Sequence, residues 1–255
     1  MYRLLAAIAA LCLSPSIALA WSQAEMNRAI DQTNFLVNND CSGTLIDKAK
    51  GFVLTAEHCI TSQYQTITKE VIDEDGKIET IKVRRVKDGT VSQLDFVNGD
   101  AVRTVTYKVK VVATDKNTDL ALLKITAPIP NVMESVLACH APNRGDVAWI
   151  IGNPMGNLYS SVGKGLVSSV QRNYDTIAFG SSEQAKEQLM QVSAGIVGGN
   201  SGGAVYDADG KLIGVPVITS RMNEILGYAV PLAVIREFLT KHDSAIAALQ
   251  SCGEK

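Results

Sequence analysis

The sequence predicts an all-β fold built from many short antiparallel strands. From residue 42 onward, short β-branched and aromatic runs alternate with Gly, Asp-Gly and Asn-Gly turns, as in sheets connected by tight turns. The chain has 255 residues, of which 46% are hydrophobic and 20% charged, so it can bury a sizeable core. These observations predict a barrel or a sandwich, in one large domain or two small ones.

The first twenty residues are typical of a signal peptide. A positive charge at Arg3 precedes an apolar run over residues 4–13, and small residues end at Ala20. An uncleaved membrane anchor is disfavoured, because the run is broken by Ser and Pro and is shorter than the ~20 residues that span a bilayer. We therefore predict export, cleavage of residues 1–20, and a mature chain over residues 21–255 without a membrane anchor.

The mature chain is expected to begin and end with helices. Residues 22–38 have apolar side chains at roughly helical spacing, and so do residues 231–250, which should pack on the β core. The strands between them are expected near residues 51–55, 109–112, 120–125, 147–151, 165–170 and 211–215.

A polar and charged stretch over residues 61–106 carries three Asp-Gly or Asn-Gly turn signals. It is expected to form an exposed elaboration of one or two hairpins. Its alternating basic residues Lys82, Arg84 and Arg85 fit a solvated face. The formal net charge of -2 and the pI near 5.9 give no basic surplus for a phosphate backbone, so nucleic acid is not an expected partner.

Three short segments carry a histidine, an aspartate and a serine, in that order along the chain: His58, Asp119 and Ser201. Acyl transfer needs a weak nucleophile, an imidazole that takes its proton, and a carboxylate that orients the imidazole. Glycines around Ser201 permit a sharp turn, so that the backbone N–H groups of Gly199 and Ser201 can form an oxyanion hole. The other histidines, His140 and His242, have no matching partner and receive no role.

The chain has five cysteines, and one of them, Cys12, lies in the predicted signal peptide. The remaining four, Cys41, Cys59, Cys139 and Cys252, predict two disulfides in an oxidising compartment. The residues alone leave all three pairings open. Once the catalytic residues and disulfides are assigned, no cluster of metal ligands remains, and we expect no metal or organic cofactor.

Six motifs, at residues 55–59, 118–125, 151–156, 165–168, 199–203 and 227–231, together resemble the trypsin-like protease domain of the HtrA/Deg group. The resemblance spans roughly residues 40–235. It implies two six-stranded antiparallel β-barrels of the chymotrypsin-like protease fold, at about residues 39–130 and 140–232. His58 and Asp119 would come from the first barrel and Ser201 from the second.

The resemblance also implies a disulfide between Cys41 and Cys59 that closes the histidine loop, with Cys139 and Cys252 as the second pair. The sequence departs from the group in two ways. Only 24 residues follow Pro231, so no PDZ domain is expected there, and the stretch over residues 61–106 is longer than in compact relatives.

Activation by a new N-terminal ammonium group is disfavoured, because Asn200 stands where trypsin-like zymogens carry an aspartate. Gly195 occupies the position at the base of the primary specificity pocket, where trypsin-like enzymes carry an aspartate. The sequence therefore predicts a preference for small or medium apolar residues before the scissile bond.

The predicted function is that of a secreted serine endopeptidase whose partners are protein or peptide substrates. One alternative is a catalytically silent binding protein that keeps the protease fold. A second alternative, a glutamyl endopeptidase, would be expected to place a histidine between residues 212 and 228, and none occurs there. The oligomeric state is left open.

Overall fold

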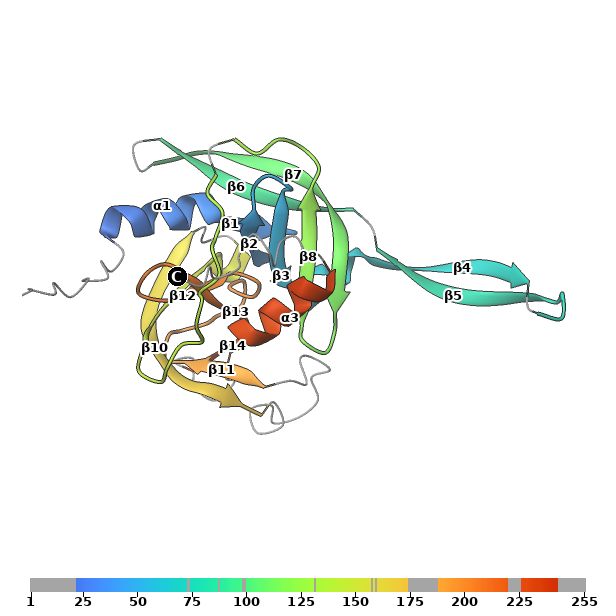
Figure 1. Cartoon of the computed structure of the whole chain (residues 1–255). Helices are drawn as coiled ribbons and strands as arrows, with labels where there is room; N and C mark the ends of the chain where they lie inside the picture. The colour runs from blue at the N-terminus through green and yellow to red at the C-terminus, as the bar shows by residue number, and fades with distance from the viewer. Residues whose placement is uncertain are drawn as a thin grey trace, which may run out of the picture.

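The computed structural model describes residues 22–72, 74–86, 88–97, 100–130, 132–156, 158, 160–173, 188–219 and 226–242. The described strands form two closed barrels and a separate two-stranded hairpin (Figure 1). This confirms the all-β expectation and decides for barrels over a sandwich.

The first barrel contains six antiparallel strands, and it closes where its first and last members pair. Their order around the barrel is β1 (Asn34–Val37), β2 (Cys41–Asp47), β3 (Phe52–Ala56), β8 (Leu120–Ile125), β7 (Asp100–Asp115) and β6 (Gly89–Val97). The pair β3 and β8 forms its centre, and Val53, Leu54, Leu122 and Leu123 are fully buried there. Burying each such side chain contributes about 1.5–3 kcal/mol.

The second barrel also has six strands and closes in the same way. Their order is β10 (Ser161–Arg172), β11 (Leu189–Val192), β14 (Gly227–Pro231), β13 (Leu212–Thr219), β12 (Ala204–Tyr206) and β9 (Val147–Gly152). Two 3-10 helices follow strands, η1 (Glu57–Gln63) after β3 and η2 (Pro154–Gly156) after β9. One apolar core is continuous through both barrels.

The N-terminal helix is shorter than the sequence predicted. Helix α1 (Gln23–Thr33) begins at a capping box, in which Glu25 N–H donates to Ser22 Oγ and Ser22 N–H donates to the Glu25 carboxylate. Residues 34–37, predicted as helix, instead form β1, which pairs with β2 and β6 and is buried throughout. The spacing of a short apolar run does not separate helix from strand, and here the tertiary pairing decides.

The C-terminal helix α3 (Leu232–His242) packs on the second barrel through Leu232, Ile235, Phe238 and Leu239. Their spacing of three and four residues agrees with the predicted helical face. Arg236 Nη2 donates to the carbonyl oxygen of Ala138 at 2.5 Å, which ties the helix to the segment between the barrels. The rest of the predicted helix, residues 243–250, lies outside the described residues.

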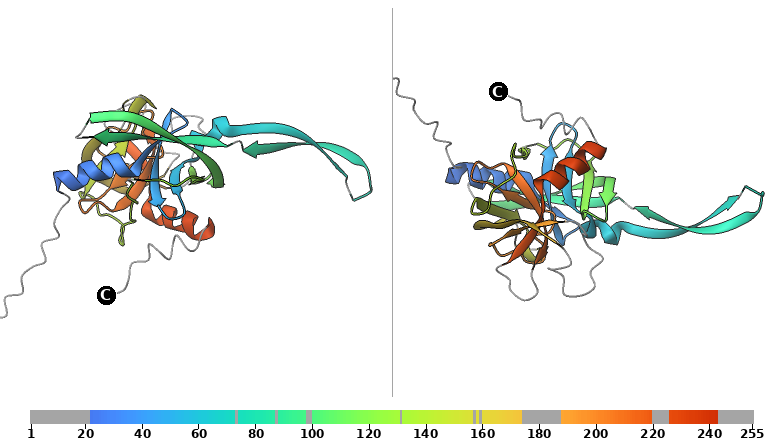
Figure 2. Two further views of the ribbon diagram at one scale, coloured as in Figure 1. Left: turned by 90° about the horizontal axis from the view of Figure 1, so that it is seen from above. Right: turned by 60° about the horizontal axis from the view of Figure 1, so that its bottom comes forward.

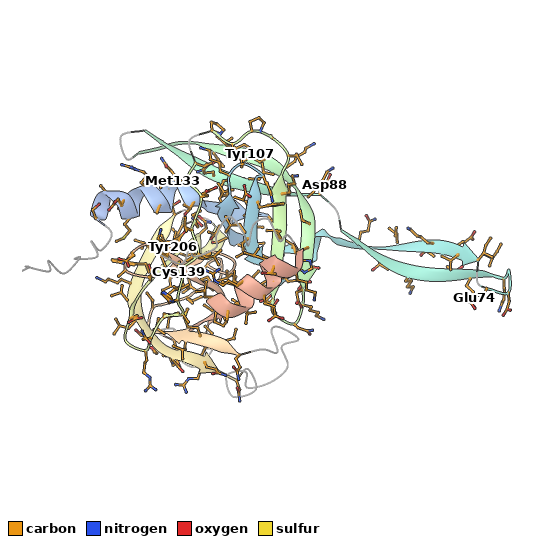
Figure 3. All side chains as sticks on the ribbon, viewed as in Figure 1. Glu74, Asp88, Tyr107, Met133, Cys139 and Tyr206 are labelled. Carbon is orange, nitrogen blue, oxygen red and sulfur yellow. A yellow bond between two sulfur atoms is a disulfide. The ribbon has the colours of Figure 1, made fainter. Side chains whose placement is uncertain are left out.

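The charged stretch over residues 61–106 is only partly an exposed elaboration. Strands β4 (Tyr64–Ile72) and β5 (Ile78–Val86) form a hairpin that projects away from both barrels, with Glu74 at its tip (Figures 2 and 3). The second half of the stretch was predicted wrongly, because residues 89–106 supply β6 and the first part of β7, which are barrel strands, and Val91, Ser92 and Gln93 are buried. One face of the β6–β7 hairpin is apolar enough to complete the barrel wall.

None of the helices in the described ranges has both the length and the hydropathy to cross a membrane.

Candidate active site

Strand pairing in the first barrel brings His58 and Asp119 together. His58 lies in η1 directly after β3, and Asp119 directly precedes β8, which pairs with β3 through Ala56 and Leu120. His58 Nδ1 lies 2.7 Å from Asp119 Oδ2. The other carboxylate oxygen, Oδ1, accepts the His58 backbone N–H at 2.9 Å.

The carboxylate is shielded from water while the imidazole keeps an open side. The Asp119 side chain is 2% exposed, against 22% for His58. Asp119 adopts a left-handed backbone conformation with φ 54°, which aspartate tolerates better than most residues, and its carbonyl accepts the Glu57 N–H at 3.1 Å. A buried carboxylate held at both oxygens can orient the imidazole.

A disulfide lies next to the histidine. Cys41 of β2 and Cys59 of η1 are bonded, with a Cα–Cα distance of 5.8 Å. This bond attaches the turn that carries His58 to the barrel wall. Cys139 is also disulfide-bonded, but Cys252, its expected partner, lies outside the described residues, so that pairing stays a prediction.

Ser201 lies in a tight loop between β11 and β12. Gly199 and Gly202 have φ values of +96° and +81°. A Cβ atom at Gly199 would lie 2.4 Å from the Asn153 carbonyl oxygen, and one at Gly202 would lie 2.2 Å from Thr55 Oγ1. Both the conformation and the close approach require glycine at these two positions.

Three successive carbonyl groups of this loop are hydrogen-bonded. Gly198 O accepts the Met155 N–H at 2.7 Å, Gly199 O accepts the Ser42 hydroxyl at 2.6 Å, and Asn200 O accepts the Gly203 N–H at 3.0 Å. In a trans peptide the N–H points opposite to the C=O, so these contacts also fix the directions of the N–H groups. Within the described residues, the N–H groups of Gly199 and Ser201 donate to no protein acceptor, which leaves two donors for an anionic oxygen.

The serine hydroxyl is not joined to the histidine in this structure. Ser201 Oγ lies 3.5 Å from the Val217 carbonyl oxygen, and the hydrogen bonds of the described residues include none between Ser201 and the His58 ring. The loop nevertheless lies beside η1, since Cys59 Sγ lies 3.6 Å from the Ser201 carbonyl oxygen. Nucleophile–base contacts are often long in the absence of substrate and shorten when it binds.

The region of the predicted specificity pocket contains a side chain that sequence reasoning missed. Gly195 is exposed, whereas the next residue, Ile196, is buried. A Cβ atom on Gly227 of β14 would come within 2.4 Å of the Ile196 side chain, so Ile196 packs directly against this glycine. The sequence around Ser201 gave no signal for this contact, because the contact depends on where β14 lies relative to the loop in the folded barrel.

The histidines without an assigned role lie on the surface. His140 and His242 are both exposed, and His242 packs on Phe238 of α3 with ring centroids 4.8 Å apart. Among the described residues, Cys41, His58 and Cys59 are close enough to suggest a metal site. Both sulfurs are consumed by the disulfide, so only His58 could act as a ligand there.

Comparison with known proteins agrees with this geometry. The family model described as a trypsin-like peptidase domain matches residues 41–215, a range that contains the histidine, the aspartate and the serine. Serine endoprotease DegS of Haemophilus influenzae is 30% identical over 234 residues, which cover 89% of this chain and 57% of DegS. DegS of Escherichia coli K12 is 26% identical over 208 residues, or 78% of this chain and 47% of DegS.

Another relative is a DegP-like serine endoprotease of Rickettsia prowazekii, whose name assigns it to the periplasm. It is 32% identical over 144 residues, which cover 55% of this chain and 27% of that protein. The crystal structure of a serine endoprotease from Yersinia pestis superposes with a TM-score of 0.58 at 24% identity, over 88% of this chain and 66% of that one. This chain therefore spans about half or less of the curated relatives' length.

Proposed function

The chain belongs to the trypsin-like peptidase family, and on that premise we propose that it is an exported serine endopeptidase that uses Ser201, His58 and Asp119. The observation that carries the proposal is the 2.7 Å contact between His58 Nδ1 and the buried Asp119 carboxylate, beside a loop with two unengaged N–H groups. A histidine oriented in this way is what serine-dependent acyl transfer requires.

The proposed reaction begins when Ser201 Oγ attacks the carbonyl carbon of the scissile peptide and His58 Nε2 takes the hydroxyl proton. Asp119 stabilises the resulting imidazolium, and the N–H groups of Gly199 and Ser201 donate to the oxygen that becomes negative. His58 then gives the proton to the leaving amine, which departs and leaves an acyl-serine. Water, deprotonated by His58, attacks the acyl-serine, releases the carboxylic acid and restores the hydroxyl.

We propose a preference for small or medium apolar residues before the scissile bond. The proposal is supported by Gly195, which offers no carboxylate to a Lys or Arg side chain, by the apolar or small residues 215–219, and by the apolar side chain of Ile196, which packs against Gly227. Cleavage of a peptide library tests this proposal. A dominant preference for Lys or Arg would contradict it.

Export rests on the predicted signal peptide, which lies outside the described residues, and on the Cys41–Cys59 disulfide, which suits an oxidising compartment. Detection of an N-terminus at Trp21 on protein recovered outside the cytoplasm would support cleavage after Ala20. Intact residues 1–20 on the exported protein would contradict it.

A fluorophosphonate probe tests the nucleophile directly, because it reacts with an activated serine. The purified mature chain should be labelled, and the Ser201→Ala variant should not. Equal labelling of both proteins would remove Ser201 from the mechanism. A folded wild-type protein that is neither labelled nor active would favour the alternative of a silent binding protein.

A further inference from the structure

We propose that Ser42, a buried residue of β2, is a positioning residue that sets the orientation of the oxyanion-binding loop. The inference rests on the proposed function and adds a determinant of its rate. Ser42 belongs to the first barrel, whereas the loop belongs to the second. The residue is fully buried and therefore does not touch solvent.

Ser42 holds the loop at two successive points on either side of Asn200. Its hydroxyl donates to the Gly199 carbonyl oxygen at 2.6 Å, and its backbone N–H donates to the Ser201 carbonyl oxygen at 2.8 Å. These two carbonyls bracket the peptide whose N–H belongs to Ser201. A single residue of the first barrel therefore restrains both ends of the segment that carries the nucleophile.

The Ser42 hydroxyl is itself directed by the second barrel. Asn153 N–H donates to Ser42 Oγ at 2.7 Å, which occupies a lone pair and leaves the hydroxyl proton to point at Gly199. The Asn153 side chain is fixed in turn, because its Oδ1 accepts from Asn34 Nδ2 at 2.9 Å and its Nδ2 donates to the Phe35 carbonyl at 2.9 Å. Both neighbours come from the start of the first barrel.

The other three hydrogen-bonded carbonyls of the loop, those of Gly198, Asn200 and Ser201, accept backbone N–H groups, which substitution of a side chain does not remove. The Gly199 carbonyl depends on a side chain. Without the Ser42 hydroxyl, the Gly199–Asn200 peptide keeps only the hydrogen bond from Asn200 N–H to the Val197 carbonyl oxygen at 3.1 Å. It can then rotate more freely about Gly199, which has no side chain to restrain it. This peptide joins the two peptides that carry the Gly199 and Ser201 N–H groups, so its rotation would turn those donors away from the direction in which an anionic oxygen must be met.

The test compares Ser42→Ala with Thr33→Val. Thr33 is also a buried residue whose hydroxyl makes two hydrogen bonds, to the Ala29 carbonyl at 2.6 Å and to the Tyr206 hydroxyl at 3.0 Å, but it lies in α1 and neither bond reaches the loop. Both substitutions should lower the melting temperature. Only Ser42→Ala should lower kcat, by about tenfold or more, with KM within roughly twofold of wild type.

A second readout separates positioning from a general loss of structure. A peptide boronic acid forms a tetrahedral adduct on the nucleophile and accepts hydrogen bonds from the oxyanion donors, so it resembles the transition state. The corresponding peptide amide forms no adduct and resembles only the bound substrate. Ser42→Ala should weaken the boronate by the same factor as kcat and leave binding of the amide unchanged. A kcat equal to that of Thr33→Val, or equal weakening of both ligands, would overturn the proposal.

Two outcomes keep this test separate from the proposed function. If wild type is folded but neither labelled by a fluorophosphonate nor active, the endopeptidase itself fails. If wild type is active and Ser42→Ala retains its kcat, only the positioning role fails. Should Ser42→Ala not fold, Asn34→Ala loosens Asn153 instead and should lower kcat about threefold; an unchanged kcat in that variant would overturn the proposal.

Discussion

The two barrels hold the proposed catalytic groups by different means. In the first barrel, His58 and Asp119 are fixed by contacts made inside that barrel: the pairing of β3 with β8, two bonds to the carboxylate, and the Cys41–Cys59 disulfide. In the second barrel, the loop of Ser201 is held partly from within, by the N–H groups of Met155 and Gly203, and partly from the first barrel, through two hydrogen bonds of Ser42 in β2.

This difference indicates which part of the site is most sensitive to movement between the barrels. A small shift of one barrel against the other would leave the His58–Asp119 pair intact but would move Ser201 and the N–H groups beside it. Misplacement by about 1 Å can cost about 100-fold in rate. The contacts of Ser42 therefore matter for the register between the barrels as well as for stability.

The largest effect is expected from removing the base. His58→Ala should lower kcat by ~10⁶-fold, and the double variant with Ser201→Ala should be no worse, because residues that act as a unit are not additive. Steady-state hydrolysis of a peptide substrate checks both. His242→Ala is the matched control, since that exposed histidine contacts Phe238 at the end of α3. Comparable losses in the control would break the assignment.

A smaller loss is expected from neutralising the orienting carboxylate. Asp119→Asn keeps the shape of the side chain but cannot stabilise the imidazolium in the same way, and kcat should fall by ~10⁴-fold. The measurement is kcat at neutral pH, together with a melting curve to establish folding. A folded variant with less than a tenfold loss would show that the pair in the first barrel does not serve the reaction.

Removing the disulfide should weaken the first barrel more than the second. Cys41→Ser with Cys59→Ser opens a loop with a sequence separation of 18 and should lower the free energy of unfolding by about 3 kcal/mol. Denaturant unfolding under oxidising conditions measures the change. A variant as stable as wild type would mean that strand pairing alone fixes the turn of His58.

The smallest effect is expected at a contact that joins the second barrel to α1 and to the segment between the barrels. The buried Tyr206 hydroxyl of β12 is hydrogen-bonded to Thr33 and Ser135. Tyr206→Phe should cost about 1 kcal/mol of stability and leave kcat unchanged. A fall in kcat like that of Ser42→Ala would show that a buried contact of this kind also controls the rate.

Tyr206 also has a pH signature. Burial raises the pKa of Tyr206 above its ordinary value of 10.0. The neutral side chain therefore contributes stability that is fully present below pH 10, and this contribution is lost as the pH rises and the unfolded chain ionises first. The stability difference between wild type and Tyr206→Phe should shrink above pH 10. A difference that is constant with pH would contradict this.

The sequence predicted an all-β fold and the candidate residues for a physical reason, whereas the two barrels were implied by the resemblance to the HtrA/Deg group. The glycines around Ser201 meet local requirements: a positive φ, and neighbouring atoms too close to leave room for a side chain. Such requirements can be recognised in a short segment. The helix predicted for residues 22–38 failed after Thr33, because β1 exists only through pairing with β2 and β6. The same limit explains why residues 89–106, in β6 and the first part of β7, were predicted as an exposed elaboration.

The contributions of Ser42, Asn153 and Ile196 could not be predicted in this way. Ser42 lies 157 positions from Gly199 in the chain, and Asn153 lies 111 positions from Ser42. A serine in a strand, or an asparagine after a strand, can make many different hydrogen bonds. Which ones Ser42 and Asn153 make depends on how the two barrels pack together. Motifs identified the candidate catalytic residues, whereas the residues that hold them in place depended on the fold.

The most direct test of the account is to trap the acyl intermediate on the protein. With a p-nitrophenyl ester of a small apolar acyl group at low pH, wild type should release a burst of nitrophenol close to one per molecule, and mass spectrometry should find the acyl group on Ser201. The burst should be absent from Ser201→Ala and strongly slowed in His58→Ala. An acyl group on another residue, or an undiminished burst in either variant, would contradict the convergence of these side chains on one reaction.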